Sequence, residues 1–174
     1  MKQPTLTTER LKLRCFGLSD AIAVQSLAGN YNVSKSTLNI PHPYEDGMAE
    51  EWINSQGGIW ESEKGVVYAI ALRDSNELIG AISLLDVDGS QGEIGYWIGE
   101  PYWGNGYCTE AADALVEFAF EKLGLGAVYA EHLAANPASG KIMKKIGMRY
   151  IGSAMKRDRH NTDSRMELYE IRNT

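Results

Sequence analysis

The sequence predicts a single α/β domain in which a mixed, mostly antiparallel sheet is flanked by helices. Its 174 residues suffice for one domain with a buried core and are too few for two comfortable ones, so we assign residues 1–174 to one domain. Strand-like alternation recurs along the chain, first as a meander and then on both sides of a helix, as in a β-α-β unit. The strongest amphipathic helix pattern, at residues 109–123, belongs to that unit.

The first elements are a strand, a helix and an irregular segment. Residues 11–16 alternate in polarity, which is typical of a strand. Ser19 or Asp20 can cap a short helix that runs to Leu27, because a side-chain oxygen at this position accepts the free amides of the first turn. Two prolines interrupt residues 30–43, where we expect no regular structure.

A second helix precedes the central strands of the sheet. We expect it to open at Glu45 or Asp46, to carry Trp52 and to end by the Gly57-Gly58 pair.

Three strands then form the predicted meander. Residues 66–72 and 78–87 are joined by residues 74–77, which have the composition of a hairpin turn. A second turn at residues 88–92 leads into a strand at residues 93–98.

The second half of the chain predicts the β-α-β unit and two final strands. A glycine-rich loop at residues 99–106 leads into the helix at 109–123, and Gly124 is placed to stop that helix. A strand at 127–133 and a helix at 138–146 follow. The remaining patterns are strands at residues 148–155 and 165–171, separated by a polar loop at residues 157–163.

Composition and charge exclude several classes of protein. Hydrophobic residues are 44% and charged residues 23% of the chain, as in ordinary globular proteins. The 17 Lys and Arg face 23 Asp and Glu, a net charge of −6, so we expect no nucleic-acid partner and a surface suited to cations such as amines. Apolar runs long enough for a membrane span or a secretory signal are missing from the sequence, so we expect a cytoplasmic protein without a membrane partner.

The cysteines and histidines do not form a metal-binding pattern. Cys15 and Cys108 are far apart, and His42, His132 and His160 are scattered along the chain. No two of these residues have the short spacing that brings metal ligands onto one face of an element. We therefore expect neither a metal site nor a disulfide framework.

The strand–glycine loop–helix segment at residues 94–111 is suited to binding an anion. The first amides of a helix have no intrahelical partners and carry the positive end of the helix dipole. Gly104 and Gly106 would let the backbone approach a phosphate without a Cβ in the way. The alternative is a ligand-free turn, because two glycines alone carry little information and neither a P-loop nor a dinucleotide fingerprint is present.

Several motifs in order resemble the GNAT superfamily of acetyl-CoA-dependent N-acetyltransferases, and within it the RimJ/RimL-like branch of ribosomal-protein N-terminal acetyltransferases. The matching segments are Thr8-Glu9-Arg10-Leu11-Lys12-Leu13-Arg14, Pro43-Tyr44-Glu45-Asp46 followed by Glu51-Trp52-Ile53, Glu93 to Ile98, Trp103-Gly104-Asn105-Gly106-Tyr107, Thr109-Glu110-Ala111, Asn136-Pro137-Ala138-Ser139 and Lys145-Ile146-Gly147-Met148. The resemblance implies a GNAT-like fold, acetyl-CoA as co-substrate without a metal, and a monomer or homodimer. It also implies a set of cofactor-binding residues: Ile98, Gly99, Gly104, Asn105, Gly106, Tyr107, Cys108, Thr109, Asn136 and Ser139.

Two positions depart from the family pattern. Pro101 replaces the polar residue with which the family's glycine loop usually begins. Met143 stands where the commoner motif has a tyrosine that protonates the leaving thiolate, and Ser139 is the nearest hydroxyl on a matching position. We therefore expect Ser139 to act as the acid. Cys108 opens the long helix, where the helix N-terminus would lower the pKa of a thiol, but we expect a small residue facing the core there and not an acyl carrier.

Glu93 is the candidate general base. An amine attacks a thioester only when it is neutral, so a base must take its proton. In regular alternation Glu93 shares one strand face with Gly95 and Trp97. The alternative is a solvated glutamate, with the base role passing to His42, Tyr44, His132 or water, although a histidine on an apolar strand is more often a core residue. The resemblance implies that a backbone amide near residues 97–99 donates to the oxyanion.

The acceptor is expected to be a primary amine contacted by His42, Tyr44 and Trp97. The RimJ/RimL-like resemblance implies a protein N-terminal α-amine. A small amine, such as a polyamine, an amino acid or an aminoglycoside, is the alternative acceptor. A catalytically decayed acyl-CoA-binding module is the alternative from a different class of function.

Overall fold

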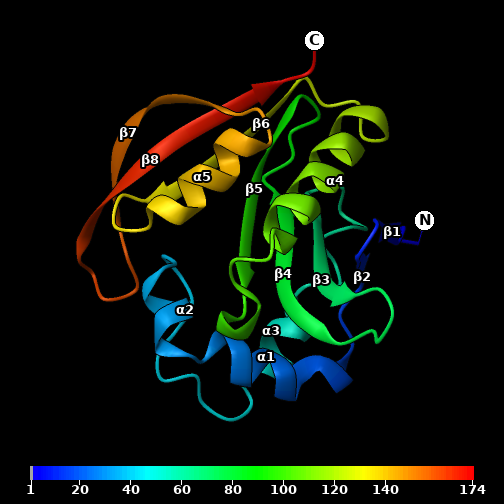
Figure 1. The fold of residues 1–174 in the computed structure, drawn as a ribbon, viewed down its shortest axis with the longest axis vertical. Coiled ribbons are helices and arrows are strands. Elements are labelled where there is room, and N and C mark those ends of the chain that lie inside the picture. The colour runs from blue at the N-terminus through cyan, green and yellow to red at the C-terminus, as the bar shows by residue number, and fades with distance from the viewer. Residues whose placement is uncertain (1) are drawn as a thin grey trace.

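The computed structural model describes residues 2–174 and confirms the predicted fold class, an eight-stranded mixed sheet flanked by helices (Figure 1). The strands are β1 (Leu6–Thr7), β2 (Leu11–Arg14), β3 (Val66–Leu72), β4 (Leu78–Leu85), β5 (Gln91–Ile98), β6 (Ala127–Leu133), β7 (Arg149–Arg157) and β8 (Asp163–Arg172). The helices are α1 (Ala21–Ala28), α2 (Tyr31–Lys35), α3 (Met48–Ser55), α4 (Tyr107–Glu121) and α5 (Pro137–Lys145), with short 3-10 turns at Leu18–Asp20 and Glu100–Tyr102.

The sheet has the order β1-β2-β3-β4-β5-β6-β8-β7, and β5 and β6 are its parallel pair. This pairing is short. It joins Gln91 to Ala127 and ends where Ile94 lies opposite Ala130. Beyond that point β5 remains paired with β4 as far as Ile98, whereas its other edge is separated from β6.

Two groups of helices cover the sheet. Helices α4 and α5 pack on one face over the main hydrophobic core, which includes Leu115 and Met143, and they lie in front of the sheet in Figure 1. Helices α1 and α3 enclose a smaller cluster with Ala69 and Leu78. The hairpin of β7 and β8 extends towards α2 at the left of the view. The separated part of β5 and β6 therefore lies between α5, the start of α4 and α2.

Most predicted elements are present with boundaries shifted by a few residues. The strands predicted at 66–72 and 127–133 have those boundaries in the structure. Helix α4 begins at Tyr107, two residues earlier than predicted, and the final hairpin is longer, so that its loop contracts to residues 158–162.

Two elements were not predicted. Strand β1 has only two residues. Helix α2 lies within residues 30–43, which we expected to be irregular, and Asn30 caps it by accepting a hydrogen bond from the amide of Asn32. No helix within residues 2–174 is long and apolar enough to cross a membrane.

The predicted starts of α1 and α3 need correction. Asp20 precedes α1, but its carboxylate pairs with Arg14 at 2.8 Å and accepts the Gly17 amide at 2.9 Å, so it does not cap that helix. Helix α3 starts at Met48 and not at Glu45 or Asp46, because Gly47 has a left-handed φ of +87° that ends the preceding turn.

Candidate active site

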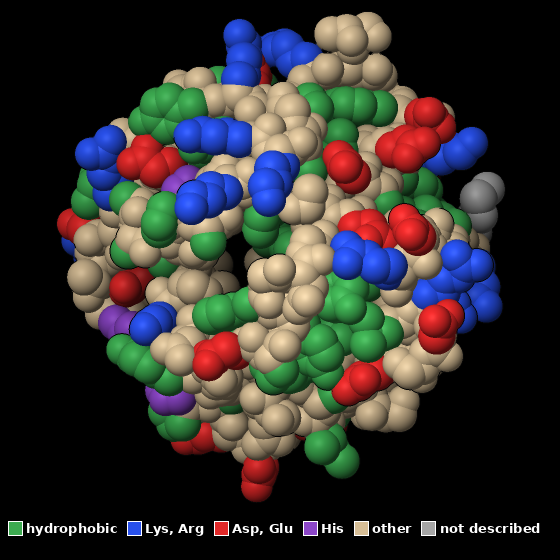
Figure 2. Space-filling model, viewed as in Figure 1, with side chains coloured by type: hydrophobic (Ala, Val, Ile, Leu, Met, Phe, Trp, Pro, Cys, Tyr) green, Lys and Arg blue, Asp and Glu red, His purple; other side chains and the backbone are tan. Residues whose placement is uncertain are grey.

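The separation of β5 from β6 leaves a cavity of about 590 Å³. Its walls come from residues 93–98 of β5, the segment after α2, the glycine loop with the start of α4, the end of β6, and α5. Figure 2 shows this face of the molecule hollowed near its centre, with Lys and Arg side chains gathered beside the hollow. Five segments of the chain therefore meet around one space.

One edge of β5 offers backbone groups to the cavity. The amide of Gly99 donates to the carbonyl of Ile79 on the β4 side at 2.8 Å, so it is not free for an oxyanion. Alternate amides of a strand point to opposite edges, which directs the amide of Ile98 towards the side from which β6 has separated. Of the donors expected within residues 97–99, Ile98 is the one so directed.

The glycine loop has the geometry of an anion-binding turn. Gly104 and Gly106 have positive φ angles of +75° and +78°, which side-chain-bearing residues rarely adopt. A Cβ on Gly104 would meet nothing within 4 Å, and one on Gly106 would meet only the Arg10 guanidinium at 3.5 Å. The first amides of α4 follow directly, at Tyr107 and Cys108. An anion could therefore approach this backbone closely.

Two lysines add positive charge to the same cavity. Lys141 and Lys145 lie four residues apart on α5, and both line the cavity. This gathers cations at one place on a chain whose net charge is −6. A polyanion that places one phosphate at the glycine loop would have further charge partners there.

Eight of the ten residues expected to bind the cofactor line the cavity: Ile98, Gly104, Gly106, Tyr107, Cys108, Thr109, Asn136 and Ser139. Gly99 and Asn105 do not. The Asn105 side-chain amide donates to the carbonyls of Tyr102 and Trp103 at 3.0 and 3.1 Å, so this side chain folds back to hold the loop.

Glu93 is partly buried and lines both this cavity and a second one of about 360 Å³ next to it. Its carboxylate forms no hydrogen bond or ion pair with residues 2–174. Burial raises the pKa of Glu93, the nearby Glu131 raises it further, and Lys156 partly opposes them. A carboxylate that is free of partners and holds its proton more tightly than usual is suited to exchanging a proton with a ligand.

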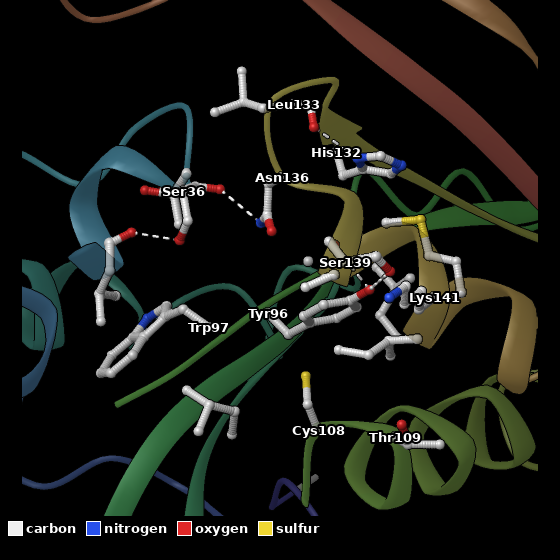
Figure 3. Close-up of a pocket in the computed structure, with 18 of the residues that line it drawn as sticks. Ser36, Tyr96, Trp97, Cys108, Thr109, His132, Leu133, Asn136, Ser139 and Lys141 are labelled. Atoms are coloured by element: carbon white, nitrogen blue, oxygen red, sulfur yellow. Dashed lines mark hydrogen bonds between the residues drawn. The ribbon is translucent and has the colours of Figure 1, made fainter. Parts of the chain in front are cut away.

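Ser139 and Tyr96 contact each other inside the cavity (Figure 3). The Ser139 hydroxyl donates to the Tyr96 hydroxyl at 3.1 Å, and the Tyr96 hydroxyl donates to the Ser139 carbonyl at 3.1 Å. Burial raises the pKa of Tyr96, as does the nearby Cys108. The expected acid is thus held by a tyrosine that comes from the opposite wall.

Cys108 and Met143 do not supply an acid. Burial raises the pKa of the Cys108 thiol, so the expected lowering by the helix N-terminus is wrong. Met143 is 1% exposed and belongs to the main core.

Asn136 joins two walls of the cavity, whereas His132 forms its hydrogen bond within its own strand. Asn136 precedes α5 without capping it, and its side-chain amide donates to the carbonyl of Ser36, just after α2, at 3.0 Å. His132 is 7% exposed, and its Nδ1 donates to the carbonyl of Leu133 at 2.7 Å. Its Nε2 has no partner within residues 2–174, so only half of its hydrogen-bonding capacity is satisfied.

Two of the three expected acceptor contacts lie outside the cavity. His42 is exposed, and its Nδ1 donates to the carbonyl of Gly29 at 3.1 Å, while Tyr44 packs against the cluster between α1 and α3. Burial raises the pKa of Tyr44. Trp97 does line the cavity, on the opposite side of β5 from Tyr96 (Figure 3). No group of three or more metal-ligating side chains occurs within residues 2–174.

Sequence reasoning missed several cavity residues. The segment after α2 contributes Ser36, Thr37, Leu38 and Asn39, and α5 contributes Lys141 and Lys145. A usable signal existed for the lysines, whose four-residue spacing puts them on one helix face. The α2 segment gave none, because its helix was not predicted.

Comparison with known proteins identifies the family. Residues 10–149 match the family model described as the acetyltransferase (GNAT) domain. A relative from Bacillus subtilis, the uncharacterized N-acetyltransferase YnaD, is 33% identical over 148 residues, which cover 84% of each chain.

Solved structures with this fold are also similar. A GNAT-family acetyltransferase from Bacillus anthracis has a TM-score of 0.85 at 26% identity and covers 97% of this chain and 98% of its own. RimL, a ribosomal L7/L12 α-N-protein acetyltransferase in complex with coenzyme A, has a TM-score of 0.83 at 17% identity, with 97% and 98% coverage. At that identity the likeness to RimL concerns the fold alone.

Proposed function

Because this chain belongs to the family of GNAT acetyltransferase domains, we propose that it transfers the acetyl group of acetyl-CoA to a primary amine, with a protein N-terminal α-amine as acceptor. The observation that carries the proposal is the cavity between β5 and β6. The cavity is lined by the turn at Gly104 and Gly106, by the Glu93 carboxylate and by the Ser139 hydroxyl, which is hydrogen-bonded to Tyr96.

The residues present fit the co-substrate. Acetyl-CoA supplies an activated acetyl group, as a thioester, together with a pyrophosphate. The open backbone at Gly104 and Gly106 and the first amides of α4 would hold the pyrophosphate, and Lys141 and Lys145 would neutralise phosphate charge. The amide of Ile98 would donate to the oxygen that gains charge during transfer.

Glu93 would accept the proton of the amine, directly or through water. Its carboxylate has no partner to displace within residues 2–174, and its raised pKa brings it closer to that of an α-amine. An α-amine has an ordinary pKa of about 7.7–8.0 and a lysine of about 10.4, so the α-amine has a neutral fraction that is larger by a few hundred fold at neutral pH. A carboxylate base can serve an α-amine more readily than a lysine.

Ser139 would give its hydroxyl proton to the leaving thiolate and recover a proton from solvent water. Its hydroxyl lies in the first turn of α5 and lines the cavity. The expected tyrosine position is occupied by the buried Met143, which carries no proton to give.

Thiol release from acetyl-CoA tests the proposal. One peptide is used with a free N-terminus and with an acetylated N-terminus, and it carries an internal lysine in both forms. Spermidine, an aminoglycoside and a free amino acid are assayed alongside. We expect turnover with the free N-terminus and none when it is blocked. Faster turnover of a small amine would contradict the N-terminal acceptor and leave acetyl transfer standing, whereas binding of acetyl-CoA without thiol release from any amine would favour a binding module.

A further inference from the structure

Tyr96 contacts the expected acid through two of that residue's polar groups, its hydroxyl and its carbonyl. The Tyr96 hydroxyl accepts a hydrogen bond from the Ser139 side chain and donates one to the Ser139 carbonyl. We propose that Tyr96 is a positioning residue for acetyl transfer, acting through Ser139 by holding its side-chain oxygen in place in the cavity. The inference rests on the proposed function, since it concerns the step in which the thiolate leaves.

The fold explains how a strand residue reaches this helix. Tyr96 lies in the part of β5 that is paired with β4 but separated from β6. Figure 3 shows its ring crossing the cavity towards Ser139 on α5, while Trp97 points to the other side of the strand. The two hydroxyls are therefore brought together across the cavity by segments 43 residues apart.

A serine in this place needs an external constraint. Serine hydroxyls rotate freely, and in the first turn of a helix they readily bond to nearby backbone. The only partner of the Ser139 hydroxyl within residues 2–174 is the Tyr96 hydroxyl. Because the Tyr96 hydroxyl also donates a hydrogen bond to the Ser139 carbonyl, it fixes both the backbone and the side chain of Ser139. The Ser139 hydroxyl is therefore already in place before the reaction, and no conformational entropy is lost in ordering it during the transfer.

Tyr96 is held as a hydrogen-bonding partner of Ser139. Burial and the neighbouring Cys108 raise the pKa of Tyr96, so the phenol stays protonated and keeps its hydrogen bonds to Ser139 at neutral and moderately alkaline pH. Its proton is also donated to a carbonyl. Tyr96 therefore remains a fixed hydrogen-bonding group while the Ser139 O–H turns from Tyr96 to the leaving thiolate, gives it a proton to form the thiol, and recovers a proton from solvent water.

The test compares Tyr96→Phe, Ser139→Ala and the double variant in steady-state transfer to an acceptor that the unaltered enzyme uses. We expect Tyr96→Phe to lower kcat at least tenfold, with the Kd for acetyl-CoA within twofold by calorimetry. In the Ser139→Ala background, the same change should lower kcat less than twofold, because residues that act as one unit are not additive.

Tyr68→Phe is the matched control. Tyr68 is fully buried on β3, and its hydroxyl donates to the Pro4 carbonyl at 2.9 Å, outside the cavity. This change should leave kcat within twofold. A merely structural loss at Tyr96 would be additive with Ser139→Ala.

Additive losses of kcat in the double variant, or an unchanged kcat in Tyr96→Phe, would overturn the inference about Tyr96. The proposed function would still stand in that case, provided that the unaltered enzyme releases thiol. If the unaltered enzyme released no thiol with any amine, the proposed function would fail and the inference with it.

Discussion

The Nε of Arg10 lies 2.7 Å from a carboxylate oxygen of Glu110, so the start of the sheet is tied to the first turn of α4. Glu110 also accepts hydrogen bonds from the Arg10 amide at 2.8 Å and from the Thr8 hydroxyl at 2.6 Å. The same guanidinium donates to the carbonyl of Asn105 and lies over the ring of Tyr107. Arg10 thus fixes the glycine loop from outside the cavity.

Replacing Glu110 by glutamine is expected to lower the free energy of unfolding by about 1–2 kcal/mol at pH 7, because charge-assisted hydrogen bonds are lost. Burial alone would raise the pKa of Glu110, but hydrogen bonds from Thr8 and Arg10 outweigh it and lower that pKa below the ordinary 4.5. The wild-type advantage should therefore be present at neutral pH and disappear as the pH falls through the lowered value. Urea unfolding at pH 7 and pH 3 measures this. Glu117→Gln, exposed on the same helix, should change little at either pH.

The glycine loop offers a second test. Gly106→Val should weaken acetyl-CoA binding tenfold or more, about 1.4 kcal/mol, because a side chain and a strained positive φ would displace the amides. Gly124→Val is the matched control, since Gly124 has a φ of +69° and open space around it but lies outside the cavity. Both variants should lose stability, and calorimetry should find weaker binding in the first alone. If both variants fold and bind acetyl-CoA with equal affinity, the glycine loop does not bind the pyrophosphate.

Hydrophobic patterns in the sequence predicted the elements whose own residues determine their structure, and missed the one that depends on distant contacts. The strand at 66–72 is continuously apolar and is buried at the centre of the sheet, so its boundaries follow from hydrophobicity. Helix α2 has only five residues, too few to be stable alone. Tertiary contacts hold it, among them the hydrogen bond from Asn136 to Ser36, and no local pattern reports those.

The same distinction applies to the site. The glycine loop is contiguous and carries its own conformational requirement, so its residues could be named from the sequence. The Tyr96–Ser139 contact depends on how α5 packs against β5, which strand alternation does not specify. His42 and Tyr44 were expected at the site because of their place in the chain, but α1 and α3 draw that loop away from the cavity.

The lysines of α5 should contribute to the salt dependence of binding. Lys141→Gln and Lys145→Gln are each expected to weaken acetyl-CoA binding a few fold at low salt, with a smaller loss at high salt, because exposed charges are screened. Lys144→Gln makes the same change on the same helix at a residue that does not line the cavity. Fluorescence or calorimetric titration at two ionic strengths compares them. An equal effect of all three would indicate only a general loss of positive charge.

Glu93→Gln should change activity and stability in opposite directions. Loss of the base is expected to lower kcat/KM about 100-fold at pH 7. Burial raises the pKa of Glu93, so its ionised form is disfavoured in the fold. Ionisation of Glu93 therefore destabilises the wild-type fold fully above the raised pKa and not at all below the ordinary pKa of 4.5. The variant should melt at a higher temperature than the wild type at pH 7, and at a similar temperature at pH 4. Thermal melts and rates on the same preparations decide this, and a less stable variant at pH 7 would contradict the burial argument.

The Glu131–Lys156 ion pair, at 2.7 Å, allows the pKa of Glu93 to be moved both ways. Glu131 raises that pKa and Lys156 lowers it. The base must be ionised to act, so the acid limb of the kcat/KM profile follows the pKa of Glu93. Glu131→Gln should shift this limb to lower pH, and Lys156→Gln should shift it to higher pH. Breaking the pair by either change would disturb the local structure in a similar way, so shifts in the same direction would assign the limb to structural damage and not to Glu93. Opposite shifts, absent in the Glu93→Gln background, would identify Glu93 as the titrating base.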